Sequence, residues 1–166
     1  MSFKLLFWSL FVLHFASSAS SLTMEESLEQ DLESAYEALD VKYGQCREQR
    51  KEHFTADEVH NEWLFSLDKD LVGTAVYVLS NMAFQRCVAA EEGVYNTALI
   101  AYVADGGDKK VLDDWLRLKR LYRDDDLKNR LSQLDFNTLK KLSTTAPFDQ
   151  PFNGLTVIEL IKGPTE

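Results

Sequence analysis

Apolar residues are densest in the stretch between residues 67 and 104. One set of apolar positions recurs here every three or four residues, the period of an α-helix, and comprises Val72, Val76, Leu79, Ala83 and Cys87. A second stripe beside it widens the apolar side and comprises Leu71, Ala75, Val78 and Met82. The pattern predicts a central buried helix or pair of helices, with residues 91–93 as a break or a weak point.

A long helix is predicted at the start of the exported chain. Thr23 and Glu26 have the spacing of a capping box, in which each side chain bonds the backbone of the other residue. From Leu28 to Cys46 the apolar residues then keep the helical period. The opposite side of this helix is acidic and is expected to face solvent.

A second capping box, Thr55 with Glu58, predicts a shorter helix that carries Trp63 and Leu64. The first helix should therefore end near residues 53–54. Three further helices are expected to begin at aspartates, which cap helix N-termini well: Asp108, Asp124 and Asp135. The acidic run 124–126 lacks the alternating ligands of a calcium loop, so it is interpreted as a helix start.

The segment 144–154 is irregular in composition, with two of the three prolines of the chain. The run 155–162 is ambiguous, because its β-branched residues suit a strand while Thr156 and Glu159 have capping-box spacing. A helix is preferred, since no other segment alternates like a strand and could pair with it. The sequence thus predicts an all-α, single-domain bundle of about six helices.

The N-terminus has the layout of a secretory signal peptide: Lys4, an apolar run from Leu5 to Phe15, and small residues after it. Cleavage after Ser18 or Ala19 would remove residues 1–19 and leave 20–166 as one helical domain. The apolar run is too short to span a bilayer, so no stable membrane anchor is expected. The protein is predicted to be secreted or periplasmic, and the absence of an Asn-x-Ser/Thr acceptor mildly favours the periplasm.

Cys46 and Cys87 are the only cysteines, and both lie in the exported part. An isolated pair in an oxidising compartment predicts one disulfide. Because each cysteine lies on the apolar stripe of its helix, the bridge would join the first helix to the central one. Closing a loop of about 42 residues should stabilise the fold by about 4 kcal/mol in the chain-entropy model.

The formal net charge of −9 argues against binding to nucleic acids and to anionic membranes. The charge is uneven, because residues 24–70 hold 14 acidic and 5 basic side chains and residues 109–141 hold 6 acidic and 10 basic ones. Aromatic residues Trp115 and Tyr122 are interleaved with the basic ones. The candidate partner-binding residues are Lys109, Lys110, Arg117, Arg120 and Arg123.

Metal chemistry has one weak candidate. If helix continued through this part of the chain, His53, Asp57 and His60 would share one face, as the ligands of a zinc-dependent hydrolase could. The capping signature at Thr55 argues against that continuity. No nucleophile elbow, metalloprotease motif or phosphate-binding glycine loop is present, so we expect no cofactor and no catalytic residues.

Two features of the central helix suggest a polar side. Arg86 borders its buried face and is expected either at the rim or paired with a carboxylate of the acidic first helix. Tyr77, Asn81 and Gln85 follow each other at helical spacing and would line a polar groove if that side were open.

The function that these observations favour is an exported, soluble, non-catalytic protein that binds another protein, of the inhibitor, immunity or envelope-factor type. One alternative is a carrier of an apolar small molecule inside the helical bundle, which requires a deep apolar pocket. The other is the metal-dependent hydrolase built on His53, Asp57 and His60.

Overall fold

The computed structural model describes residues 23–51, 54–119 and 125–163. Those residues form seven helices and no strand, so the predicted all-α class is confirmed, with one helix more than expected. The helices are α1 (Met24–Gln49), α2 (Glu62–Ser66), α3 (Lys69–Ala104), α4 (Lys109–Leu118), α5 (Asp125–Leu131), α6 (Phe136–Ser143) and α7 (Gly154–Lys162). The signal-peptide prediction lies outside the described residues.

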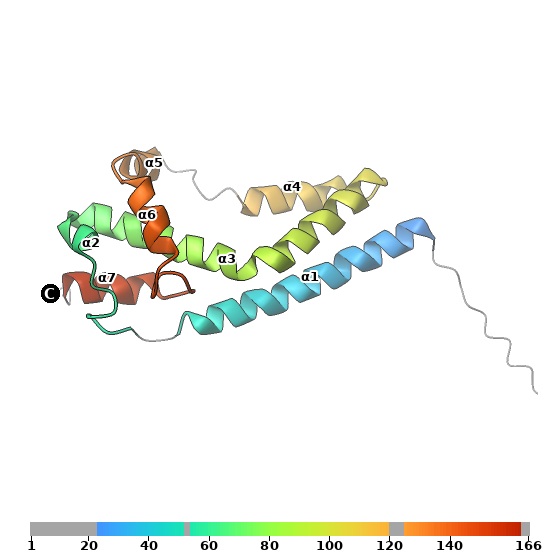
Figure 1. The fold of residues 1–166 in the computed structure, drawn as a ribbon. Coiled ribbons are helices and arrows are strands. Elements are labelled where there is room, and N and C mark those ends of the chain that lie inside the picture. The colour runs from blue at the N-terminus through green and yellow to red at the C-terminus, as the bar shows by residue number, and fades with distance from the viewer. Residues whose placement is uncertain (1–22, 52–53, 120–124, 164–166) are drawn as a thin grey trace, which may run out of the picture.

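The longest helix, α3, runs along the centre of the structure, and the other helices lie around it (Figure 1). Asp68 caps its N-terminus, and it continues without interruption to Ala104. Of the two alternatives given for residues 91–93, the break is therefore wrong. Gly93 is exposed and helical, and the packing of α1 and α4 on either side of this half of α3 outweighs the glycine's modest helix penalty.

Two separate clusters of buried residues pack on α3. The first, which we call the head, joins α3 to α2, α6, α7 and the segment 144–153, and its central side chains are Val72, Val76, Leu79, Leu139, Phe152 and Val157. The second, which we call the arm, joins α3 to α1 and α4, and its central side chains are Leu39, Cys46, Phe84, Val88, Tyr95 and Leu99. Along α3 the change from head to arm falls between Ala83 and Phe84.

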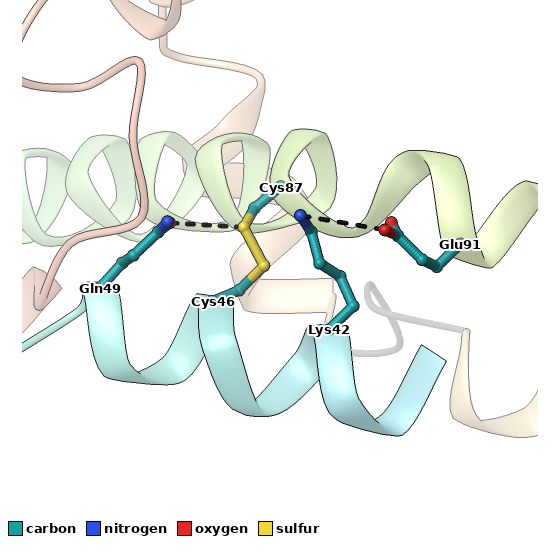
Figure 2. The surroundings of a disulfide bond; sticks show 5 residues. All are labelled: Lys42, Cys46, Gln49, Cys87 and Glu91. Atoms are coloured by element: carbon teal, nitrogen blue, oxygen red, sulfur yellow. Dashed lines mark hydrogen bonds and ion pairs between the residues drawn. A yellow bond between two sulfur atoms is a disulfide. The ribbon is translucent and has the colours of Figure 1, made fainter. Parts of the chain in front are cut away.

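The Cys46–Cys87 disulfide is present and lies at the base of the arm (Figure 2). Its Cα atoms are 6.1 Å apart, within the usual range, and Cys46 is fully buried. Lys42 and Glu91 form an ion pair one helical turn further along the arm, with 3.9 Å between Nζ and Oε1. The bridge therefore fixes the register of α1 against α3, as the apolar stripes predicted.

Helix starts were predicted well where the cap is local. The Thr23–Glu26 capping box begins α1, Asp108 caps α4 and Asp135 caps α6. The predicted start at Asp124 lies outside the described residues, and α5 begins at Asp125 where the description resumes.

The second predicted helix starts later than expected. Thr55 and Glu58 do form their capping box, with the Thr55 backbone N–H 2.7 Å from the Glu58 carboxylate. This box closes a turn, however, and α2 begins only after Asn61, whose side chain accepts from the N–H groups of Trp63 and Leu64.

The ambiguous run 155–162 is helical, as preferred. Its cap is Asn153 and not Thr156, so α7 starts one turn earlier than the capping-box pattern indicated. The connection 144–153 is irregular, as predicted, yet it contributes Phe148 and Phe152 to the head, both essentially buried. No helix in the described parts of the chain is long and apolar enough to cross a membrane.

Candidate binding surfaces

The histidine hypothesis depended on a continuous helix, and the structure has turns there. Asp57 and His60 are exposed in residues 54–61, and the His60 ring lies against Phe65 with centroids 4.8 Å apart. His53 lies outside the described residues. Within the described ranges, no group of three or more His, Cys, Asp or Glu side chains is arranged to hold a metal ion.

Two of the three basic residues of α4 form ion pairs with an acid of their own helix. Asp114 pairs with Lys110 and with Arg117, the latter at 3.0 Å. The hydrogen bond from Lys110, aided by both positive charges, lowers the pKa of Asp114. Lys109 is exposed, while Arg120 and Arg123 lie outside the described residues.

Arg86 lies at the rim of the head, as one of its two predicted alternatives stated, but its partners are not carboxylates. Its guanidinium donates to the backbone carbonyls of Ser143 and Phe148, the latter at 3.1 Å. These carbonyls lie at the end of α6 and in the segment that follows it. Arg86 thus joins α3 to α6 and the segment after it, at the point where the head stops covering α3.

A cleft of about 480 Å³ lies between α1, α3 and α4. Its apolar lining comes from Tyr36, Leu39, Tyr43, Phe84, Trp115 and Leu118, and its polar lining comes from Asp40, Arg47, Arg50, Asn81, Gln85 and Lys119. This is an open surface cleft with a mixed lining, in contrast to the deep apolar pocket that the carrier hypothesis required.

Aromatic rings give the cleft a rigid wall. The rings of Tyr43 and Phe84 are 5.4 Å apart, and Trp115 packs edge-on against Tyr95 at 4.8 Å. The indole N–H of Trp115 donates to Asn96 Oδ1 at 2.7 Å, which fixes the ring's orientation. Trp115 packs on the arm cluster, and one side of it borders the cleft.

Cations stand over these rings. Lys119 lies 4.5 Å from the Trp115 ring centroid and is neutralised by Glu92, with Tyr43 as a further partner. The Arg50 Cζ atom lies 4.3 Å from the centroid of Phe84, and Arg50 forms no ion pair with a carboxylate of the described residues. Burial, together with the neighbouring charge of Arg47, lowers the pKa of Arg50.

The predicted polar row on α3 is only partly brought together. Asn81 and Gln85 line this cleft, whereas Tyr77 borders a different hollow beside α5 and α7. Asn81 Nδ2 and Arg50 Nε are buried, and within the described residues neither has a hydrogen-bond partner. Sequence spacing indicated Asn81, but Arg50 was missed because its role depends on how the end of α1 meets α3.

A second surface is the outward side of α3 in the arm, which we call the open α3 face. It consists of Ala89, Ala90, Gly93, Val94, Thr97, Ile100, Ala101 and Ala104, which share one side of the helix at its 3.6-residue period. None of these side chains is charged, and Val94 and Ile100 are each 61% exposed. A surface helix normally places its charged residues on the solvent side, so this face is unusual.

The open α3 face continues a side of the helix that is covered in the head. Val72, Val76 and Leu79 occupy the same side of the helix about three or more turns earlier, and all three are buried there. A shallow groove of about 470 Å³ between α1 and α3 runs beside it, with Ala38 and Val41 in its lining. Glu91 also lines this groove, and its buried Oε2 has no partner in the described part of the chain.

Comparison of the chain with protein-family models, with curated protein sequences and with solved structures gave no match.

Proposed function

We propose that the protein is exported and acts as a non-catalytic binding module for another protein, with the open α3 face as its docking surface. The observation that carries this proposal is the uncharged, solvent-facing side of α3 beyond Arg86, where Val94 and Ile100 are exposed. Apolar area exposed in this way favours association, because contact with a partner removes it from water. The Cys46–Cys87 disulfide supports an oxidising compartment.

The partner that fits is an apolar helix with basic residues along its edge. Small side chains at Ala90, Gly93 and Thr97 allow another helix to approach the backbone closely, while Val94 and Ile100 offer ridges. Helix α1, which lies alongside, carries eight acidic and two basic residues. A Lys or Arg of the partner could also satisfy the unpartnered Glu91 Oε2 in the groove.

Site-specific photocrosslinking in the producing cells tests this proposal. A benzoylphenylalanine replaces Val94 in one variant and Leu155, which is 73% exposed on α7, in the control variant. The crosslinked partner is identified by mass spectrometry. Its affinity is then measured for the purified protein described here and for the variants Val94→Asp and Leu155→Asp of that protein. We expect an adduct at position 94 and a loss of affinity of about tenfold or more for Val94→Asp alone.

Three results would refute the proposal. Equal crosslinking at positions 94 and 155 would show that the open α3 face has no special role. A specific adduct whose affinity is insensitive to Val94→Asp would place the binding surface elsewhere. An adduct with a second copy of this chain would identify self-association and would equally exclude a different partner.

A further inference from the structure

The cleft between α1, α3 and α4 carries an inference that goes beyond protein binding. Its lining from α1 and the C-cap of α1 includes Leu39, Tyr43 and Arg50, whereas the groove beside the open α3 face is lined by Ala38, Val41 and Gln45. On a helical period these two sets lie on opposite sides of α1. The two surfaces are therefore physically separate.

Unpaired donors are the first evidence for a ligand. Arg50 Nε and Asn81 Nδ2 come from different helices, border the same cleft and are both buried without a hydrogen-bond partner. Leaving a buried donor unsatisfied costs about 1–3 kcal/mol, and more for a charged group. Because both groups donate, the partner that would satisfy them is an acceptor.

The charge around these donors makes that acceptor an anion. Arg47 and Arg50 both border the cleft, and among the described residues that line it Asp40 is the one carboxylate. Neither arginine forms an ion pair among the described residues, whereas Lys119 is neutralised by Glu92. The Arg50 guanidinium lies over Phe84 and forms no ion pair in the described residues, so its positive charge at the edge of the cleft is left for an anionic group to neutralise.

The size and the aromatic wall of the cleft indicate what the uncharged part of the ligand is like. A volume of about 480 Å³ suits a small organic molecule, and the rings of Tyr43, Phe84 and Trp115 offer flat apolar surface. We propose that this cleft binds a small organic anion with an apolar, ring-bearing body, whose anionic group is held by Arg50 and Asn81.

Arg50 also borders a second hollow, of about 550 Å³, on the head side of α1. Lys51, Ser80 and Thr156 line that hollow, whereas Asn81 and the aromatic rings do not. A test of the proposal must therefore distinguish the two hollows. Lys51 provides the matched control, because it is the next residue, carries the same charge and is absent from the cleft.

The experiment compares two fluorescent dyes that share a ring system. Anilinonaphthalene sulfonate carries an anionic group and N-phenylnaphthylamine does not, and each is titrated into the mature, disulfide-bonded protein. Trp115 borders the cleft, so energy transfer from it to the bound dye, lost in Trp115→Phe, reports where the dye binds. We expect saturable binding of one sulfonate dye and weaker binding of the neutral one.

Variants then locate the anion. Arg50→Gln should weaken binding of the sulfonate dye about tenfold or more and leave the neutral dye unchanged, because a charge-assisted hydrogen bond is lost. Asn81→Asp should weaken it as well, and Lys51→Gln should not. Circular dichroism confirms the fold of each variant, and Asn81→Asp keeps the test valid if Arg50→Gln does not fold.

Three outcomes overturn the proposal. Equal affinity for the two dyes would show that no anion is recognised, and equal effects of Arg50→Gln and Lys51→Gln would place the anion in the other hollow. No binding at all would mean that water satisfies the two donors. Because Val94→Asp leaves the cleft intact, its effect on the protein partner is independent of these results.

Discussion

The head and the arm are built on the same helix, yet they differ in how completely that helix is covered. In the head, α2, α6, α7 and the segment 144–153 enclose α3, and Phe152 and Leu139 are fully buried. In the arm, α1 and α4 cover part of α3 and leave the open α3 face to solvent (Figure 1). The head is thus built for stability, and the arm carries both candidate binding surfaces.

The difference also shows in how polar groups are used. The head satisfies its rim internally, since Arg86 donates to two backbone carbonyls and Ser80 Oγ donates to the Phe152 carbonyl at 3.1 Å. Arg50 Nε and Glu91 Oε2 in the arm, and Asn81 Nδ2 just before the boundary on α3, have no partners in the described residues. Buried polar groups are normally satisfied, and the proposals of a ligand in the cleft and of a partner on the open α3 face both draw on these exceptions.

Removing the disulfide should lower the stability of the protein more than any other change, and it should destabilise mainly the arm. Replacing Cys46 and Cys87 by serine releases a loop closed across 41 residues of sequence separation. The expected loss is about 4 kcal/mol in the free energy of unfolding, measured by urea denaturation. Hydrogen exchange should accelerate more in α1 than in α6 and α7; equal acceleration everywhere would show that head and arm unfold as one unit.

A cavity in the head should destabilise the protein by a slightly smaller amount. Leu139 is fully buried, so Leu139→Ala should cost about 3 kcal/mol through lost burial and the cavity left behind. The matched control Leu155→Ala, at a position 73% exposed, should change stability by less than about 0.5 kcal/mol. If Leu139→Ala exposes the α1 amides to exchange as strongly as those of α7, the division into head and arm is wrong.

The smallest expected effect on stability comes from the two capping boxes, of which one lies in the arm and one in the head. Backbone and hydroxyl hydrogen bonds from Thr23 lower the pKa of Glu26 in the arm, and those from Thr55 lower the pKa of Glu58 in the head. Because the pKa is lower in the folded state, each carboxylate stabilises the fold above its unfolded pKa. That contribution disappears as the pH falls through the lower, folded-state pKa.

Nuclear magnetic resonance titration of the glutamate side chains checks this expectation. Thr55→Ala should raise the pKa of Glu58 and leave that of Glu26 unchanged, and Thr23→Ala should do the reverse. A pKa of Glu58 that does not respond to Thr55→Ala would mean that the capping box does not persist in solution.

Local patterns in the sequence predicted the elements that depend on local interactions. The apolar stripes of α3, the caps at Thr23, Asp108 and Asp135, and the pairing of Cys46 with Cys87 all follow from spacing along one or two helices. The later start of α2 was missed because a capping box can close a turn without starting a helix. Thr156 was misread because Asn153 satisfies the first turn of α7 instead.

The candidate surfaces depend on contacts that spacing does not encode. Arg86 reaches carbonyls 57 and 62 residues away, and the cleft requires the end of α1 to meet α3 and α4. The open α3 face did leave a signal, because residues 93–104 contain no charged side chain. From the sequence alone this run predicts only the continuation of a buried helix, because the sequence does not show which side the neighbouring helices cover.

The positions of the two cysteines also determine what the chain can do while it is being made. Synthesis runs from the N-terminus, so Cys46 and Cys87 both emerge before any residue of α4, α5, α6 or α7 exists. At that stage Val72, Val76 and Leu79 lack the residues that later bury them. The disulfide between α1 and α3 can thus form while the apolar stripe of α3 is still exposed to solvent. Chaperones that hold unfolded chains can bind such a stripe until the last helices are synthesised.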